Sequence, residues 1–488
     1  MKYTDIEPYL NNYAAVPIVI DQPCRDFDPE PIVAALRAGG HTAFMLHGAP
    51  DDGVSRYTYI VDRPRTRYEL NGHTLTTISG TTQHQMHVTN PGATFTKILT
   101  ATRTPVLPEL PPFVGGLAGY FAYEYAQTVH PQLHLTPAPD GGLPDALLLV
   151  ADCVIIHDAV TNQLFLSQIT PTMGLTQADF AEIQVALQAR LQTITDIMQQ
   201  GMPAGAFGLD TTLTPDYTPE AFAARVAKVQ AHIHDGDIFQ LILANPQRAQ
   251  MHGDLLNAAK TVLRDNPTPY QFYLGSGTRE VLGASPELLV ARHDEELQTF
   301  PLAGTRRRGQ TPEEDAQLAS ELTHSEKECS EHNMLIDLGR NDLGAVSQLG
   351  SVQVTSVRQL LYFASVMHMG STVTSRIAPG ITPLDVVAAL LPAGTLAGAP
   401  KLSAMTIISQ LEGTRRGVYG GTIGYLGYDG NLELAIGIRL AQREGDQISL
   451  HAGAGIVTDS VAKHEYQEFN NKIRGVKNAL LRASEELA

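Results

Sequence analysis

Four glutamates at helical spacing are the residues of this chain best placed to bind a cation. Glu465 and Glu468 lie three positions apart in a C-terminal segment whose apolar residues recur every three to four positions, so they share one face of an expected helix. Glu328 and Glu331 repeat this spacing within residues 311–343, which also read as helical. Magnesium takes one or two carboxylates and keeps several waters. Either pair alone is more often a solvated helix face, so a magnesium site requires the fold to bring the two pairs together.

A glycine-rich stretch before the C-terminal helix suggests an anion site beside the cation site. Gly453, Ala454 and Gly455 are expected to form a turn at the end of a strand, and such glycines let backbone N–H groups approach a ligand. Lys472 shares the helix face of Glu465 and Glu468. This nearby turn makes Glu465 and Glu468 the better candidate pair.

An arginine within an alternating apolar stretch could fix an anionic ligand. Residues 432–440 alternate strictly, which predicts one strand. Arg439 then projects from the same face as Ala435 and Gly437, which are small. That face leaves room for a ligand beside a fixed guanidinium.

Histidines give weaker signals. His368 ends an apolar, strand-like run, where a lone histidine is usually a satisfied core residue, and as a general base it would need an orienting partner. His324 and His332 lie among the acidic pairs, but no His/Cys spacing typical of zinc ligands appears. Zinc is therefore disfavoured.

Composition restricts the class of protein. The 488 residues are too many for one ordinary core, and 43% hydrophobic residues suffice for two domains. With 34 basic and 51 acidic residues the net charge is −17, which disfavours binding to nucleic acid or an anionic membrane. An anionic substrate therefore needs a local basic pocket or a metal.

Cysteine usage and the N-terminal residues favour a cytoplasmic protein. Cys24, Cys153 and Cys329 are isolated, which fits a reducing compartment. Met1–Tyr13 lacks the apolar core of a signal peptide, and no apolar run is long enough to span a bilayer.

The order of expected elements gives an α+β protein. Residues 1–165 read as a β-rich N-terminal domain, 166–216 as a helix and linker, and 217–488 as a second domain with both strands and helices. Helices are expected after caps at Thr176 and Thr218.

Several motifs, in the right order, resemble the chorismate-utilising enzymes, and among these most closely the large subunits of anthranilate synthase. The resemblance implies an α+β fold, a two-domain antiparallel β-sandwich with flanking helices and chorismate deep between the layers. The match is dense from residue 218 to 484. It includes Gly236–Gln240, Ser285–Glu287, Ala303–Arg306, Glu331–His332, Asp337–Asp342, Gly394–Thr395, Gly398–Lys401, Thr414–Gly417 and Gly453–Ser460.

The resemblance also implies roles for individual residues. Glu331 and Glu468 would hold Mg²⁺, supported by Glu328 and Glu465, and the cation would neutralise the ring carboxylate of chorismate. The reaction would add ammonia at ring C2 with loss of the C4 hydroxyl, and then eliminate pyruvate. His368 and Thr395 would be catalytic. The substrate would be bound by Gly304, Thr305, Tyr419, Arg439, Gly453, Ala454, Gly455 and Lys472.

Two positions distinguish between relatives. The aminodeoxychorismate enzymes have a lysine where this chain has Ala303, and the isochorismate and salicylate enzymes have a water-activating lysine where it has Gln240. Both differences favour ammonia addition and anthranilate formation. The chain has no glutaminase-like cysteine setting, so a separate glutamine amidotransferase subunit is expected. Alternatives are an enzyme that stops at aminodeoxyisochorismate, an aminodeoxychorismate synthase, or a silent regulatory subunit that binds only tryptophan and a partner.

Tryptophan feedback is expected to be weakened. The family's inhibitor site usually includes a Leu-Leu-Glu-Ser run, whereas this chain has Met45–Gly48, and Gly48 lacks the hydroxyl. The other wall, formed by Pro269, Tyr270 and Gln271, is retained. One lost hydrogen bond corresponds to about 1 kcal/mol of inhibitor binding.

Overall fold

Two large antiparallel sheets form the centre of the protein. The computed structural model describes residues 1–48, 56–362 and 366–487. The first sheet has the order β1 (Ala15–Pro23), β10 (Gln163–Pro171), β9 (Cys153–Asp158), β3 (Tyr57–Val61), β2 (Ala43–His47), β15 (Tyr270–Ser276), β16 (Arg279–Ser285), β25 (Leu440–Glu444), β26 (Gln447–Leu450), β14 (Gln247–Gly253) and β11 (Phe207–Leu209), with β12 (Thr214–Pro215) on β14.

The second sheet is of similar size. Its order is β19 (Leu302–Arg307), β21 (Val366–Arg376), β18 (Glu296–Phe300), β17 (Leu288–His293), β24 (Leu432–Ile436), β23 (Thr422–Gly427), β7 (Gly116–Phe121), β8 (Ala146–Ala151), β4 (Thr66–Asn71), β5 (Thr74–Ser79) and β6 (Thr82–His87), with β20 (Gln353–Tyr362) on β21. A third, small sheet consists of β22 (Gly398–Ala399), β13 (Gln240–Ala244) and β27 (Gly453–Ile456).

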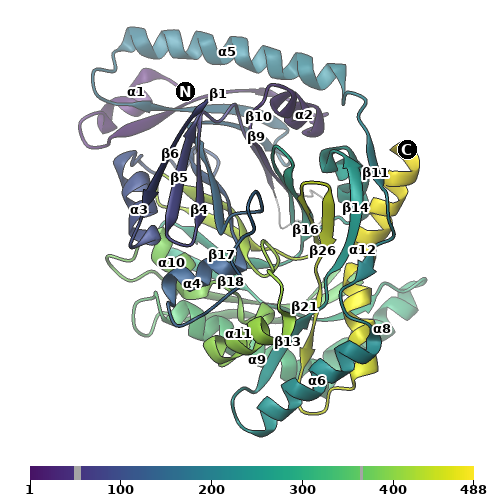
Figure 1. Cartoon of the computed structure of the whole chain (residues 1–488). Coiled ribbons are helices and arrows are strands. Elements are labelled where there is room, and N and C mark those ends of the chain that lie inside the picture. Colours follow the sequence, from purple (N-terminus) through teal and green to yellow (C-terminus); the bar gives the residue numbers. More distant parts are fainter. Residues whose placement is uncertain (49–55, 363–365, 488) are drawn as a thin grey trace.

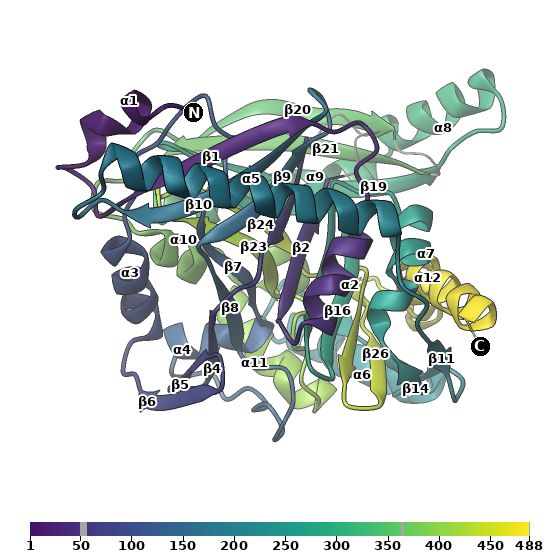
Figure 2. The same cartoon turned by 90° about the horizontal axis from the view of Figure 1, so that it is seen from above.

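Helices lie outside both large sheets (Figures 1 and 2). The α-helices are α1 (Tyr3–Ile6), α2 (Glu30–Ala38), α3 (Pro91–Ala101), α4 (Ala126–Val129), α5 (Gln177–Gln200), α6 (Pro219–His234), α7 (Ala259–Asp265), α8 (Pro312–His324), α9 (Glu326–Gly344), α10 (Pro383–Leu390), α11 (Lys401–Glu412) and α12 (Ala462–Leu487). Short 3-10 turns are η1 (Glu7–Tyr9), η3 (Tyr123–Tyr125), η4 (Leu255–Ala258) and η5 (Gly394–Leu396). Figure 2 shows α5 lying across β1 and β10.

Alternation along the strands explains the layers. In β8, Leu147 packs in the core between the sheets with Phe44 and Phe272, whereas Leu148 points to the opposite face and packs in the core that includes Val387 of α10. The outer face of the first sheet is covered by α2, α5, α7 and α12, and α6 packs on the third sheet. The predicted β-sandwich with flanking helices is confirmed.

Local signals placed the long helices correctly. Thr176 and Thr218 accept hydrogen bonds from the first turns of α5 and α6, as N-cap residues do. In α12 the predicted stripe is buried at Phe469 and Ile473 and continues along the helix. The predicted helix over 311–343 is two helices, because Ser325 has an extended conformation and caps α9.

Two predictions near the candidate site were wrong in detail. Residues 432–440 are not one strand: β24 ends at Ile436, and β25 begins at Leu440 in the other sheet. The alternation continues through the connecting residues 437–439, so the sequence does not reveal the crossing. Gly453 and Gly455 form the strand β27 rather than a turn, because β13 pairs with them.

Both large sheets combine strands from the N-terminal and the C-terminal segments. β7 pairs with β23, and β2 pairs with β15, so residues 1–165 and 217–488 share each sheet. β10 also extends past residue 165. The predicted domain boundaries therefore divide the sequence, but they do not separate the two large sheets. Among the described residues, no helix combines the length and apolarity needed to cross a bilayer.

Candidate active site

A partly exposed arginine lies where the chain crosses between the two large sheets. Arg439 has a left-handed backbone with φ of 50°, and its carbonyl accepts a hydrogen bond from Ala284 N at 3.1 Å. A Cβ on Gly437 would lie 2.0 Å from the carbonyl oxygen of Val418, so this crossing requires glycine there. Burial lowers the pKa of Arg439, and the nearby Glu287 carboxyl opposes that shift. The position of the guanidinium is therefore fixed, as expected. However, Arg439 lies in the connection between β24 and β25 and not in a strand.

Glu287 faces this arginine and was missed as a site residue by the sequence analysis. Its side chain is buried just before β17, and burial raises its pKa to about 7 against the opposing effects of Thr395, Arg439 and Lys472. Thr395 Oγ1 donates to Glu287 Oε1 at 3.4 Å. Nothing in the local pattern distinguishes this glutamate from a surface residue, although the matching Ser-Pro-Glu motif contains it. The carboxyl is half-protonated near neutral pH and can donate a proton.

His368 lies in β21 next to the same group of charges. Burial, followed by the positive charge of Arg439, lowers its pKa to about 4. Its Nδ1 lies 3.1 Å from the carbonyl oxygen of Gly304, which requires a proton on Nδ1 and leaves the ring lone pair on Nε2. The orienting partner that a general base needs is therefore a backbone carbonyl. The side chain of Thr305 lies outside the described part of the structure, but its backbone pairs with His368.

The third sheet lies close to two further candidate substrate-binding residues, Lys472 and Tyr419. Lys472 Nζ donates to the carbonyl of Gly453 at 3.1 Å. A Cβ on Gly453 would lie 3.0 Å from the hydroxyl oxygen of Tyr419, so this tyrosine reaches the glycine strand closely. Ala454 is fully buried and packs with the first sheet's outer core, whereas Gly455 is partly exposed. Tyr419, Lys472 and the glycine strand are thus brought together.

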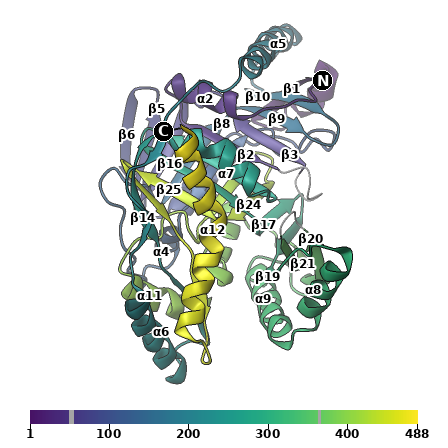
Figure 3. The same ribbon diagram turned by 90° about the vertical axis from the view of Figure 1, so that its right-hand side faces the viewer.

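The two glutamate pairs lie on α9 and α12, which face each other at one end of the molecule (Figure 3). Although Glu331 reaches solvent, its pKa is raised by partial burial and by the negative charges of Glu328 and Glu468. Burial and the charge of Glu468 also raise the pKa of Glu465, while a hydrogen bond from Ser460 opposes the shift. Negative charge therefore accumulates where the two helices approach.

Two cations partly balance these carboxylates. Arg306 Nη1 lies 3.2 Å from Glu328 Oε1, and Lys472 Nζ lies 2.8 Å from Glu468 Oε1. A Cβ on Gly304, which has φ of 60°, would lie 3.0 Å from Glu328 Oε2. The acidic group thus adjoins the strand that orients His368.

The donor set suits a hard cation that keeps most of its waters. In the described ranges, no three His, Cys, Asp or Glu side chains converge closely enough to hold a metal by themselves. Magnesium needs only one or two carboxylates. The negative charges of Glu328 and Glu468 that raise the pKa of Glu331 are charges that a magnesium ion would neutralise. His332 is buried, and its Nε2 lies 2.7 Å from Ser371 Oγ.

Residues 56–478 match the family of chorismate binding enzymes. The chain belongs to this family. It is 33% identical to anthranilate synthase component 1 of Pseudomonas putida over 98% of this chain and 97% of that protein. It is 38% identical to aminodeoxychorismate synthase component 1 of Bacillus subtilis over 78% of this chain and 79% of that protein. The crystal structure of anthranilate synthase component I from Streptococcus pneumoniae superposes with a TM-score of 0.74 at 30% identity, covering 87% of this chain and 92% of that one.

In this chorismate binding enzyme, strand pairing brings together residues that were predicted to bind tryptophan. Gln271 pairs with His47 in the β2–β15 ladder, which brings Gly48 beside Tyr270. The amide of Gln271 donates to the carbonyls of Leu263 and Asn266, at 2.6 and 3.1 Å. Its side chain therefore holds the turn before β15. Pro269 and Tyr270 are buried next to it.

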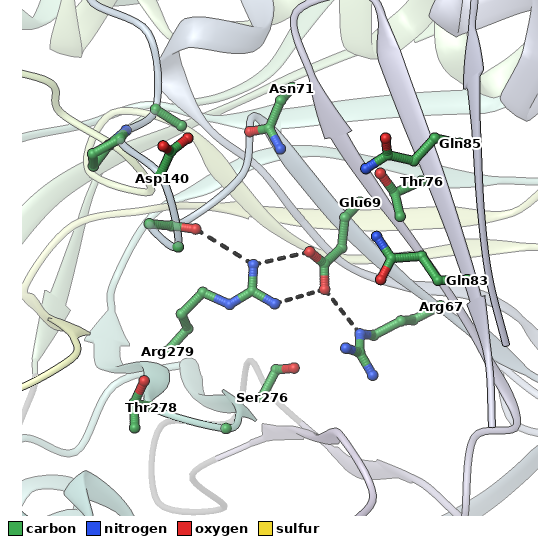
Figure 4. A pocket seen from close by; sticks show the side chains of 15 residues that line it. Arg67, Glu69, Asn71, Thr76, Gln83, Gln85, Asp140, Ser276, Thr278 and Arg279 are labelled. Atoms are coloured by element: carbon green, nitrogen blue, oxygen red, sulfur yellow. Dashed lines mark hydrogen bonds and ion pairs between the residues drawn. The ribbon is translucent and has the colours of Figure 1, made fainter. Parts of the chain in front are cut away.

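A cavity of about 580 Å³ in the same enzyme lies elsewhere (Figure 4). Arg279 of β16 binds both carboxylate oxygens of Glu69 in β4, at 2.6 and 2.9 Å, and Arg67 Nε binds Glu69 at 2.9 Å. These bonds join the first large sheet to the second. The cavity shares no lining residue with the group around Arg439, so it is a bridged gap between sheets rather than the candidate active site.

Proposed function

We propose that this chain is the large subunit of an anthranilate synthase, which converts chorismate and ammonia to anthranilate and pyruvate. The observation that carries the proposal is the convergence of Arg439, Glu287 and His368 beside a facing set of carboxylates. A fixed guanidinium suits a substrate carboxylate, and an acid and a base with opposite pKa shifts suit proton transfers in both directions.

In the first step ammonia forms a bond to ring C2 and the C4 hydroxyl leaves as water. Glu287 is the buried group able to supply the proton to that hydroxyl, because its pKa of about 7 keeps it partly protonated. Arg439 and Tyr419 hold the enolpyruvyl carboxylate during this step, together with backbone N–H groups of Gly453–Gly455.

In the second step the C2 proton is removed, the enolpyruvyl carbon–oxygen bond breaks, and the side chain takes up a proton to leave as pyruvate. His368 is the base, since its ring is neutral and its Nε2 carries the lone pair. Glu331 and Glu468 would hold Mg²⁺, with Glu328 and Glu465 supporting its waters. When bound, this ion would neutralise the ring carboxylate of chorismate.

The main alternative is an enzyme that stops at the amino intermediate, and aminodeoxychorismate synthase is less favoured. Ala303 is buried in β19 and supplies no amine for covalent attack, and Gln240 supplies no basic group to activate water. Both residues favour direct attack by ammonia. A silent regulatory subunit is disfavoured by the acid, base and carboxylates described above.

Ammonia is proposed to come from a separate glutamine amidotransferase subunit. The three cysteines are free, and burial raises the pKa of the thiols of Cys24 and Cys153. Neither thiol is suited to attack glutamine, because the thiolate is the nucleophile. Free cysteines also fit the reducing cytoplasm, where we place the enzyme.

Product analysis tests the assignment. The purified chain, supplied with chorismate, Mg²⁺ and ammonium at a pH high enough to provide free ammonia, should release equal amounts of anthranilate and pyruvate. Anthranilate is followed by its fluorescence and pyruvate by a coupled assay. Amino intermediate without pyruvate would identify the alternative, and no turnover would refute both.

We further propose that tryptophan inhibits this enzyme weakly. Gly48 has no hydroxyl, and the Gln271 amide is engaged by backbone carbonyls. An inhibition curve for the wild type and for Gly48→Ser should show tighter inhibition in the variant, by about fivefold for one hydrogen bond. Equal curves would contradict this proposal.

A further inference from the structure

Three exposed apolar residues lie around one end of the small third sheet. Phe239 is 75% exposed, Val461 52% and Val457 41%. The last pair of the β13–β27 ladder is Leu241 with Ile456, so Phe239 and Val457 lie just beyond it. We call these three residues the apolar tip. In Figures 1 and 3 the elements next to it, α6 and the start of α12, lie side by side.

The backbone of the apolar tip is firmly held. Phe239 N donates to the carbonyl of Ala399 at 2.7 Å, and the neighbours Ile238 and Gln240 are buried. The amide of Gln230 on α6 donates to the carbonyls of Thr458 and Ser460, at 2.9 and 3.0 Å. The phenyl ring of Phe239 is thus presented to water by a fixed backbone, which forgoes hydrophobic stabilisation. Exposed aromatic anchors of this kind are enriched at protein interfaces.

The apolar tip adjoins two elements of the candidate active site. Phe239 directly precedes Gln240, the first residue of β13, which pairs with the glycine strand β27. On the other side, Val461 directly precedes α12, which carries Glu465 and Glu468. A protein bound at the tip would therefore lie next to the site that must receive ammonia.

We propose that the apolar tip is the docking surface for the glutamine-hydrolysing subunit. This inference rests on the proposed function, because it requires ammonia to arrive from another protein. In the described chain, Cys329 donates its thiol proton to the carbonyl of Thr323, and burial raises the pKa values of Cys24 and Cys153, so this chain offers no thiol suited to releasing that ammonia.

Charge around the tip specifies the partner's surface. Asp235 and Asp237 precede Phe239, and Asp459 lies between the two valines; all three are exposed. The complementary surface is an apolar pocket for the phenyl ring with basic side chains at its rim. A glutaminase with this surface would deliver ammonia beside Gln240 with little diffusion through solvent.

Charge substitutions at the tip test the proposal. Phe239→Asp and Val461→Asp are compared with Val185→Asp, a control at a 71% exposed valine of α5. Each variant is co-expressed with the amidotransferase subunit of the same organism, and their affinity is measured by sedimentation. We expect the two tip variants to bind at least about tenfold more weakly. Glutamine-dependent anthranilate formation should fall in parallel, while ammonium-dependent turnover and the control stay at the wild-type level.

The outcomes separate this inference from the proposed function. Wild-type binding and wild-type use of glutamine in both tip variants would overturn the docking proposal. So would a change in self-association with unchanged partner binding, since the tip would then contact a second copy of the chain. If Phe239→Asp also loses ammonium-dependent turnover, the substitution has damaged the enzyme itself. The partner affinity of Val461→Asp then decides whether the docking proposal holds. Failure of the wild type with ammonium would refute the proposed function alone, and the sedimentation result would still judge the docking surface.

Discussion

At the scale of single residues, burial shifts an acid and a base in opposite directions within one small region. The pKa of Glu287 is raised to about 7, and that of His368 is lowered to about 4. Burial disfavours the charged form of both groups, which explains both shifts. Arg439 opposes the shift of the glutamate and adds to that of the histidine, because it attracts the carboxylate and repels an imidazolium. Near neutral pH the site therefore contains a proton donor and a neutral base.

Replacing Glu287 with Gln should remove the acid while keeping the size of the side chain. We expect turnover to fall by about 10²- to 10⁴-fold, the usual contribution of a general acid. In the wild type, kcat/KM for chorismate at constant free ammonia should decline as the pH rises above about 7, because the protonated carboxyl is lost. A wild-type profile flat from pH 6 to 9 would exclude this role.

The same carboxyl should destabilise the folded protein at high pH. Its pKa rises from 4.5 to about 7 on folding, so between these values the folded state binds more protons than the unfolded state. Stability from this group is then full below pH 4.5 and declines up to pH 7, by on the order of 3 kcal/mol. Urea unfolding should show Glu287→Gln more stable than the wild type at pH 8, with a smaller difference at pH 5. A constant difference would contradict the shift.

His368→Ala should separate the two steps. The first step does not use this base, so the amino intermediate should accumulate while pyruvate release slows by about 10²- to 10⁴-fold. Chromatography of quenched reactions measures both products. If anthranilate and the intermediate fell together, His368 would act before or during ammonia addition instead.

At the scale of elements, small residues in β27 allow the third sheet to approach its neighbours closely. A Cβ on Gly453 would lie 2.8 Å from Ile242 Cγ2 and 3.0 Å from the Tyr419 hydroxyl, whereas one on Gly455 would meet Ile242 at an ordinary 3.5 Å. The close approach of β27 to its neighbours therefore depends on the first glycine.

A matched pair of alanine substitutions tests this dependence. Gly453→Ala should destabilise the protein by about 1–3 kcal/mol through overpacking and should raise KM for chorismate. Gly455→Ala should leave unfolding within about 0.5 kcal/mol of the wild type. Thermal unfolding and steady-state kinetics measure both. Equal effects of the two substitutions would mean that the contacts of Gly453 can relax.

At the scale of the whole molecule, one buried arginine contacts both the N-terminal and the C-terminal segments. Arg416 forms an ion pair with Glu412 at 2.5 Å, and it donates to the carbonyls of Leu396 and Ile242. Its guanidinium also lies 4.7 Å from the ring centre of Tyr123, from the N-terminal segment. Both charged side chains are only 2% exposed, so water cannot solvate either charge if its partner is removed.

Removing one member of this pair should be costly. Arg416→Met should lower the free energy of unfolding by about 3–5 kcal/mol, because Glu412 keeps a buried charge without its partner. Arg340→Met is the control, since its ion pair with Asp337 is exposed and should contribute at most about 0.5 kcal/mol. Urea unfolding compares the two. Similar losses would show that the buried charge finds other compensation.

Periodicity and capping determined much of this architecture from the sequence alone. The stripe on α12 and the caps at Thr176 and Thr218 depend on neighbours along the chain, so they could be predicted. The resemblance named most candidate site residues, and the structure brings Arg439, His368, Lys472 and Glu331 into one region. Their roles remain proposals.

Only the tertiary structure decided which groups meet and in what state of protonation. Alternation continues unchanged where the chain leaves β24 for β25, so the crossing that contains Arg439 could not be read from residues 432–440. Glu287 became a candidate acid only because distant strands exclude water from it. Local spacing determines which face of an element a side chain occupies, whereas burial and electrostatic shifts depend on elements hundreds of residues apart.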